Sequence, residues 1–249
     1  MLLALALYCR LPFGRFHKGN SEVKRIAALI GRTPDALAMR LSNFASQDPI
    51  HRARGVKGLD GGGKKVAQFW AEATAEWNST AVETELVWQR ATGELPTERE
   101  CELEPPGGPT EATRLSKVRL VQGFFRRTVL ASYASACAVC GISPEPLLVA
   151  SHIIPWSINE ARRADPTNGL CLCALHDKAF DSGLLSIDEG MRILVSNRLQ
   201  QSGRERNTPV SKLHIAGLIE IAGQELRLPS RFPPDASAVA WHRKMRFVA

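Results

Sequence analysis

The second half of the chain contains the sequence CAVCGISPEPLLVASHIIPWSINEARRADPTNGLCLCALHDKAFD, residues 137–181. It opens with Cys137 and Cys140 as a CxxC pair, and Cys173 and His176 form a CxxH pair later in the same stretch. Three thiolates and one imidazole can fill a tetrahedral zinc site with no open position, which is the arrangement of a structural zinc. A redox dithiol is the alternative for an isolated CxxC pair, but the second half-site favours zinc.

One of the four zinc ligands has an alternative among the remaining cysteines. Cys171 rivals Cys173 as the fourth zinc ligand, because residues two apart on a strand point to the same face.

The apolar start Leu2–Tyr8 lacks a basic leader and a small-residue cleavage site, so we expect a buried first helix rather than a signal peptide. We therefore expect a reducing, cytoplasmic compartment in which cysteines are thiols or metal ligands.

Three further motifs follow the first cysteine pair in a fixed order. They are ASHIIPW at 150–156, NGL at 168–170 and HDKAFD at 176–181. Together with the cysteine pairs, they resemble the HNH nuclease family over about residues 120–200. The resemblance implies an α+β fold with a ββα-metal nuclease domain held by a zinc knuckle. It also implies a restriction-type DNA endonuclease, with modified bases as candidate targets, that leaves 5′-phosphate and 3′-hydroxyl ends.

The resemblance assigns roles to single residues. His152 matches the general base that activates water, and Asn168 matches the residue that holds the hairpin loop. Asp177 stands where the family has its last His, and Ser151 stands where many members have an acidic residue or His. Asp177 and Asp181 are four apart on an expected helix, so both carboxylates can hold a catalytic Mg²⁺ or Mn²⁺ ion. A structural role at the helix end is the alternative for Asp181.

Charge is divided unevenly along this chain of 249 residues and net charge +7. Residues 1–65 carry twelve Lys and Arg against four Asp and Glu, residues 66–113 two against ten, and residues 114–249 eighteen against eleven. Two basic lobes suit a polyanion such as double-stranded DNA, because each neutralised phosphate releases counterions. A solvated surface with a charge bias is the alternative. There is no run of eighteen apolar residues, so we expect no membrane span.

Composition divides the chain into three parts. We expect a helical DNA-binding domain over residues 1–92, an acidic linker rich in Pro and Gly over 93–116, and the nuclease domain with a C-terminal extension over 117–249. A second copy of the chain is a candidate partner. The competing function is a zinc-containing DNA-binding regulator with an inactive HNH core.

Two helices in the first part resemble a helix-turn-helix. Asn20 can cap the first helix and Gly31 can end it, while Thr33 can cap a second helix that carries Arg40. A compact helical hairpin without DNA contact is the alternative. The tail residues His242, Arg243, Lys244 and Arg246 are weaker candidates for DNA contact. The candidate DNA-binding residues are Arg40, Arg52, Arg54, Lys57, Arg126 and Arg127, although the last two could instead cover a helix surface.

Overall fold

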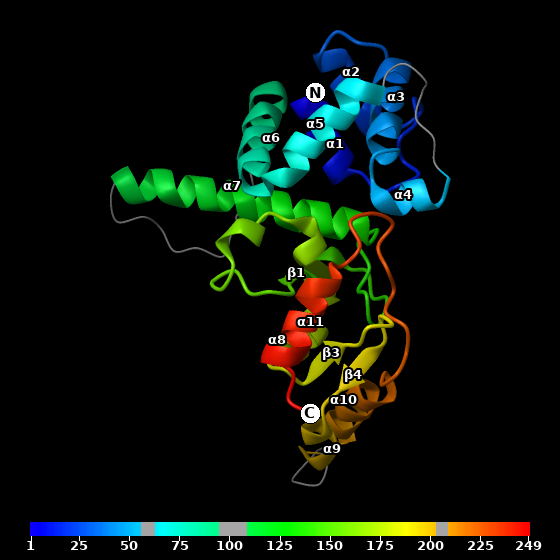
Figure 1. Cartoon of the computed structure of the whole chain (residues 1–249), viewed down its shortest axis with the longest axis vertical. Coiled ribbons are helices and arrows are strands. Elements are labelled where there is room, and N and C mark those ends of the chain that lie inside the picture. Colours follow the sequence, from blue (N-terminus) through cyan, green and yellow to red (C-terminus); the bar gives the residue numbers. More distant parts are fainter. Residues whose placement is uncertain (56–62, 95–108, 203–208) are drawn as a thin grey trace.

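The computed structural model describes residues 1–55, 63–94, 109–202 and 209–249. A group of helices lies on one side of the long helix α7, and two small sheets lie on its other side (Figure 1). The helices of the first part are α1 (Leu2–Arg10), α2 (Ser21–Leu29), α3 (Pro34–Ala45), α4 (Pro49–Ala53), α5 (Gly63–Ala75), α6 (Trp77–Thr92) and α7 (Pro109–Ser132).

The expected first helix is confirmed and is buried. All side chains from Leu3 to Cys9 are buried, because α1 lies among α3, α6 and α7. A helix that is apolar on every face is stable only in such a central position. Among the described helices, none is both long enough and apolar enough to cross a membrane.

The expected helix pair in the first part is also present. Asn20 Oδ1 accepts hydrogen bonds from the backbone N–H groups of Glu22 and Val23, at 2.9 and 3.1 Å. Thr33 Oγ1 caps α3 through the N–H of Ala36 at 3.2 Å. The two helices pack together, and Gly31 takes a φ of 62° in the turn between them. Whether the pair binds DNA stays a prediction.

The second part has the expected α+β architecture. Strands β1 (Leu148–His152) and β2 (Gly169–Cys173) pair antiparallel, and helix α8 (Ala174–Asp181) begins directly after β2. This hairpin and helix form the expected ββα unit. The later elements are β3 (Leu185–Ile187), β4 (Ile193–Val195), α9 (Asn197–Ser202), α10 (Pro209–Glu220) and α11 (Ala236–Met245), and β3 pairs with β4.

Helix α7 joins the two hydrophobic cores. Phe124 belongs to the core of the first helices, and the next residue, Phe125, belongs to the core around the hairpin. The helix begins at Pro109, so the end of the stretch expected as a linker is helical. Proline is compatible with a helix start because its missing N–H would be unpaired there anyway. The proposed division into parts at residues 92 and 117 stays a prediction.

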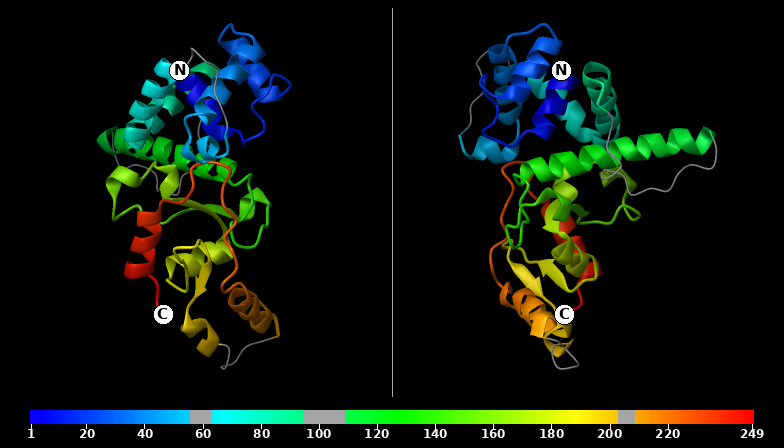
Figure 2. Two further views of the ribbon diagram at one scale, coloured as in Figure 1. Left: turned by 45° about the vertical axis from the view of Figure 1, so that its right-hand side comes forward. Right: turned by 180° about the vertical axis from the view of Figure 1, so that it is seen from behind.

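The segment before α11 returns to the first helices. It runs from the second part past α7, as seen from two further directions (Figure 2). Arg231 and Phe232 are buried there, and the ring of Phe232 stacks on Trp70 with centroids 6.0 Å apart. Phe232, from the last third of the chain, therefore belongs to the core of the first helices.

Candidate active site and metal centre

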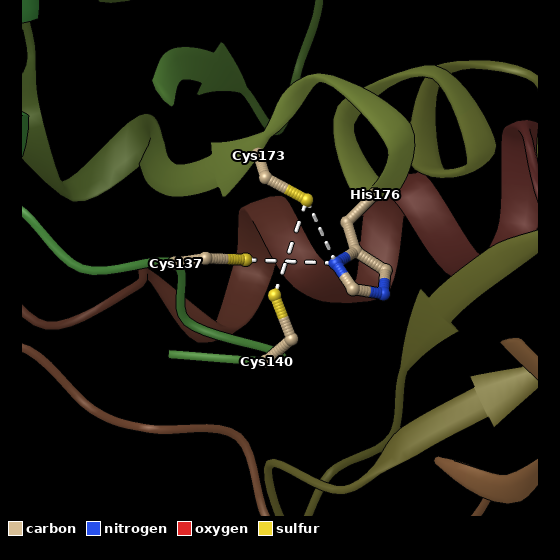
Figure 3. A group of neighbouring side chains, drawn as sticks. All are labelled: Cys137, Cys140, Cys173 and His176. Carbon is tan, nitrogen blue, oxygen red and sulfur yellow. Dashed lines mark hydrogen bonds between the residues drawn. The ribbon is translucent and has the colours of Figure 1, made fainter. Parts of the chain in front are cut away.

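Cys137, Cys140, Cys173 and His176 converge as the CxxC and CxxH spacing predicts (Figure 3). Their ligand atoms all lie within 4.8 Å of one another. His176 Nδ1 is 3.1 Å from Cys173 Sγ and 3.6 Å from Cys137 Sγ, and the sulfurs of Cys140 and Cys173 are 4.0 Å apart. A tetrahedral zinc ion has S···S edges of about 3.8 Å and S···N edges of about 3.5 Å. The four groups therefore fit a zinc ion.

Local backbone structure places the four ligands. Cys137 and Cys140 lie in a turn closed by the bond from the Gly141 N–H to Cys137 O at 2.9 Å. Cys173 ends β2, and His176 lies in the first turn of α8. The alternative ligand Cys171 is buried on β2 and is not part of the group.

Neighbouring groups shift the pKa values of the cysteine thiols in this group. Burial opposes ionisation of Cys137, but contact with His176 and with backbone N–H groups lowers its pKa to about 6. Burial raises the pKa of Cys140 to about 12, and the nearby Cys137 thiolate adds to this effect. Thiolates this close repel one another, so a bound cation is what allows all of them to ionise together.

His152 lies at the end of β1, opposite Gly169. Its ring stacks on Phe125 with centroids 3.7 Å apart, and Trp156 meets it edge-on at 5.6 Å. Its Nε2 is 2.9 Å from the backbone oxygen of Arg163. A carbonyl oxygen can only accept, so Nε2 carries the proton and the Nδ1 lone pair is left as the base. Burial lowers the pKa of His152 to about 4, so the imidazole is neutral at pH 7.

Asn168 closes the loop between β1 and β2. Its side chain is fully buried, and Oδ1 accepts the N–H of Ile154 at 2.9 Å. Its Nδ2 donates to Ile154 O at 3.0 Å and to Arg162 O at 3.4 Å. Both ends of the amide therefore fix the backbone that follows His152, which is the kind of role that the HNH resemblance implies for Asn168.

The two aspartates expected to bind a catalytic ion both lie on α8. Asp177 is half-buried in its first turn, and Asp181 is exposed at its last residue. Within the described part of the chain, neither belongs to a group of three metal-ligating side chains. One or two carboxylates are nevertheless the usual protein share of a Mg²⁺ site, where water and substrate phosphate fill the other positions. The donor chemistry therefore fits Mg²⁺ or Mn²⁺. Ser151 is buried, and its Oγ makes no hydrogen bond to the described residues.

The expected DNA-binding arginines differ in their surroundings. Arg52 is exposed on α4, Arg54 is exposed directly after it, and Arg40 is half-buried on α3. Arg126 instead donates to Leu148 O at 2.8 Å, and Arg127 pairs with the buried carboxylate of Glu85. Each of these two therefore has a structural partner inside the protein. Lys57 lies outside the described residues.

The expectation of DNA contact is wrong for His242. It is buried against Phe180, whose backbone oxygen lies 3.1 Å from Nε2, while Nδ1 is 3.0 Å from Ser186 Oγ. The basic residues around it misled the prediction, because Lys244 and Arg246 are exposed whereas His242 turns inward. The contact of Asn78 with the loop after β1 was not predicted from the sequence. A single polar residue near a helix start gives no pattern that would reveal such a contact.

Residues 137–188 match the HNH endonuclease family. Among solved structures, a modification dependent TagI restriction endonuclease is similar at 21% identity with a TM-score of 0.35, and the match covers 48% of this chain and 36% of that one. No curated protein sequence matches significantly. The matched stretch includes the zinc ligands, His152 and Asn168, so residues 137–188 are similar to an HNH endonuclease domain.

Proposed function

We propose that the protein is a metal-dependent, restriction-type endonuclease that hydrolyses phosphodiester bonds of double-stranded DNA. The observation that carries the proposal is the HNH endonuclease match over residues 137–188, within which His152 has a base nitrogen left unprotonated. In this proposal the zinc ion is structural, because its four protein ligands leave no open position.

His152 acts as the general base. Its Nδ1 accepts a proton from the attacking water, while the bond from Nε2–H to Arg163 O stabilises the imidazolium that forms. The new bond joins water oxygen to phosphorus, and the bond to the 3′ oxygen breaks. The departing 3′ oxygen takes a proton from solvent water, which leaves a 5′-phosphate and a 3′-hydroxyl. Asp177 and Asp181 are the residues that would hold the divalent ion, which supplies positive charge for the transition state.

The helical part is proposed to bind the DNA. Residues 1–65 carry a net +8, from twelve basic and four acidic residues, and Arg52 and Arg54 are exposed. Binding by the full chain should weaken with a log–log salt slope of about −0.9 for each phosphate neutralised. Replacing Arg52 or Arg54 with Ala should reduce that slope by about one unit, whereas an unchanged slope in both variants would remove α4 from the interface.

A DNA-binding regulator with an inactive HNH core is the competing function. The observation that favours it is that neither Asp177 nor Asp181 belongs to a cluster of three ligands among the described residues. Ser151, in place of an acidic residue or His, points the same way. Both functions include DNA binding, so only cleavage separates them.

The decisive experiment incubates zinc-loaded protein with plasmid and Mg²⁺ or Mn²⁺, using methylated and unmethylated DNA. Wild type should cleave, and His152→Ala should lose on the order of 10²–10⁴-fold in rate while still binding DNA in EDTA. Binding without any cleavage by wild type on every substrate would establish the regulator instead.

The same assay tests the divalent-metal ligands. Asp177→Asn should impair cleavage more than Asp181→Asn, and high metal concentration should partly restore it, because the amide keeps the shape but removes the charge. A dead Asp181→Asn beside a normal Asp177→Asn would move the ligand to Asp181.

A further inference from the structure

Asn78, near the start of α6, bridges to the loop that follows β1. Its Nδ2 donates to the backbone oxygen of Glu160 at 2.8 Å, and its Oδ1 accepts the N–H of Ala164 at 2.9 Å. One amide therefore binds two backbone groups four residues apart in the loop. These contacts join parts of the chain that are more than 80 residues apart in sequence.

The segment held in this way contains the partner of the proposed general base. Arg163 lies between Glu160 and Ala164, and its backbone oxygen accepts the Nε2–H of His152 at 2.9 Å. We propose that Asn78 is a positioning residue that holds the Arg163 carbonyl in place and thereby fixes the tautomer and orientation of His152. This inference rests on the proposed function for its catalytic consequence, but the placement of the imidazole can be tested without it.

Packing supports the bridge on the side of the first helices. Ala164 is fully buried in the core that those helices form, and Trp156 from the same loop packs against that core. On the side of the hairpin, the bond from Asn168 Nδ2 to Arg162 O is long, at 3.4 Å. The amide of Asn78 thus holds the backbone around Arg163 more closely than the amide of Asn168 does.

The side chain of Arg163 does not replace this restraint. Its guanidinium donates to Trp156 O at 3.1 Å and to the carboxylate of Glu160 at 2.7 Å, and both partners belong to the same loop. Such bonds stiffen the loop internally but do not fix its distance from His152. Asn78 comes from a packed helix, so it relates the loop to the rest of the molecule.

Loss of the bridge should act on the imidazole. Phe125 holds the ring plane by stacking, but a stacked ring can still exchange its proton between Nδ1 and Nε2. The Arg163 carbonyl selects the Nε2–H form by accepting its proton. If the carbonyl moves, the fraction of His152 with a free Nδ1 lone pair falls. A misplacement of about 1 Å far from the reacting atoms can reduce the rate by on the order of 10²-fold.

The test compares full-length, zinc-loaded Asn78→Ala and Asn78→Asp with wild type and with Ser79→Ala. Ser79 is the exposed next residue on α6, so its variant controls for a change in helix propensity at this position. Asn78→Asp keeps the acceptor for the Ala164 N–H but loses the donor to Glu160 O. Imidazole ¹⁵N NMR, with the His152 signals assigned by their loss in His152→Gln, reports the tautomer, and plasmid cleavage gives kcat and KM.

We expect the Nε2–H tautomer in wild type and Ser79→Ala, and a mixture of tautomers in both Asn78 variants. We also expect kcat to fall by about 10–100-fold in these variants with KM little changed. An unchanged tautomer in Asn78→Ala would overturn the inference. This would hold even if the variant were less active, because a loss of thermal stability alone can lower activity. If wild type does not cleave any DNA, the proposed function fails while the tautomer comparison still decides the role of Asn78.

Discussion

Loss of Arg231 should disturb the packing of the first helices against the rest of the chain. Its side chain is fully buried and donates to the backbone oxygens of Tyr8 and, at 3.0 Å, of Cys9. These carbonyls lie at the C-terminal end of α1, where a cation is favoured by the helix dipole. The guanidinium also lies 4.7 Å from the centre of the Tyr8 ring.

The cost of Arg231→Ala follows from these contacts. A hydrogen bond from a charged donor contributes about 1.5–3 kcal/mol, so two of them suggest a loss of about 3–6 kcal/mol. Asp48 is also fully buried, and burial raises the pKa of its carboxyl, while the nearby charge of Arg231 opposes this rise. Loss of that charge would remove this compensation and add to the loss of stability. Total stability is typically about 5–15 kcal/mol, so the variant should be close to unfolding.

Urea unfolding of the zinc-loaded full chain at pH 7 measures this effect. Circular dichroism follows the helices, and tryptophan fluorescence reports the contact of Phe232 with Trp70. Arg227→Ala is the matched control, because Arg227 is an exposed arginine in the same segment and its loss should stay within about 0.5 kcal/mol. A decrease below about 1 kcal/mol for Arg231→Ala would show that the buried guanidinium does not hold α1.

Three further predictions concern the metal, the hairpin and pH. Cys137→Ser should lose the zinc and unfold the second part, since structural zinc binding supplies folding free energy on the order of 10 kcal/mol. If elemental analysis found no zinc in folded wild-type protein, this prediction would be contradicted. Gly169→Ala should cost about 1–3 kcal/mol, because a Cβ there lies 2.5 Å from Val129 Cγ2 and 2.9 Å from Phe125 Cζ. Since Phe125 stacks on His152, cleavage should fall as well, and Gly190→Ala, which has room for a Cβ, should behave as wild type in both unfolding and cleavage. Burial lowers the pKa of His242 to about 4, so its neutral form contributes stability that is complete above about pH 6.5 and is lost as the pH falls towards 4. When the pH falls from 7 to 5, the free energy of unfolding of His242→Gln should therefore decrease by about 2 kcal/mol less than that of wild type. Equal decreases in urea unfolding would refute the assignment.

The zinc centre and the helix caps were predictable because their signals are local. Two cysteines three apart can turn onto one ion wherever the fold places them, so CxxC and CxxH spacing survives without knowledge of the tertiary structure. Asn20 and Thr33 cap helices through N–H groups two or three residues away, which is also a local interaction. The ββα unit followed from a resemblance whose motifs lie within a single stretch of sequence.

Contacts between distant segments could not be predicted in the same way. From the sequence, Arg127 is a basic residue on a helix that precedes the zinc site. Nothing near it in the sequence indicates that the carboxylate of Glu85 is buried beside its guanidinium. Hydrophobic periodicity reports which face of a helix is covered, but not which element covers it. His152 shows the consequence for the site. The motif identifies the imidazole, whereas its geometry depends on Phe125 from α7 and on a carbonyl in a loop bound by Asn78. The chemical identity of the base is therefore encoded locally, and its orientation is encoded by packing between the two parts of the chain.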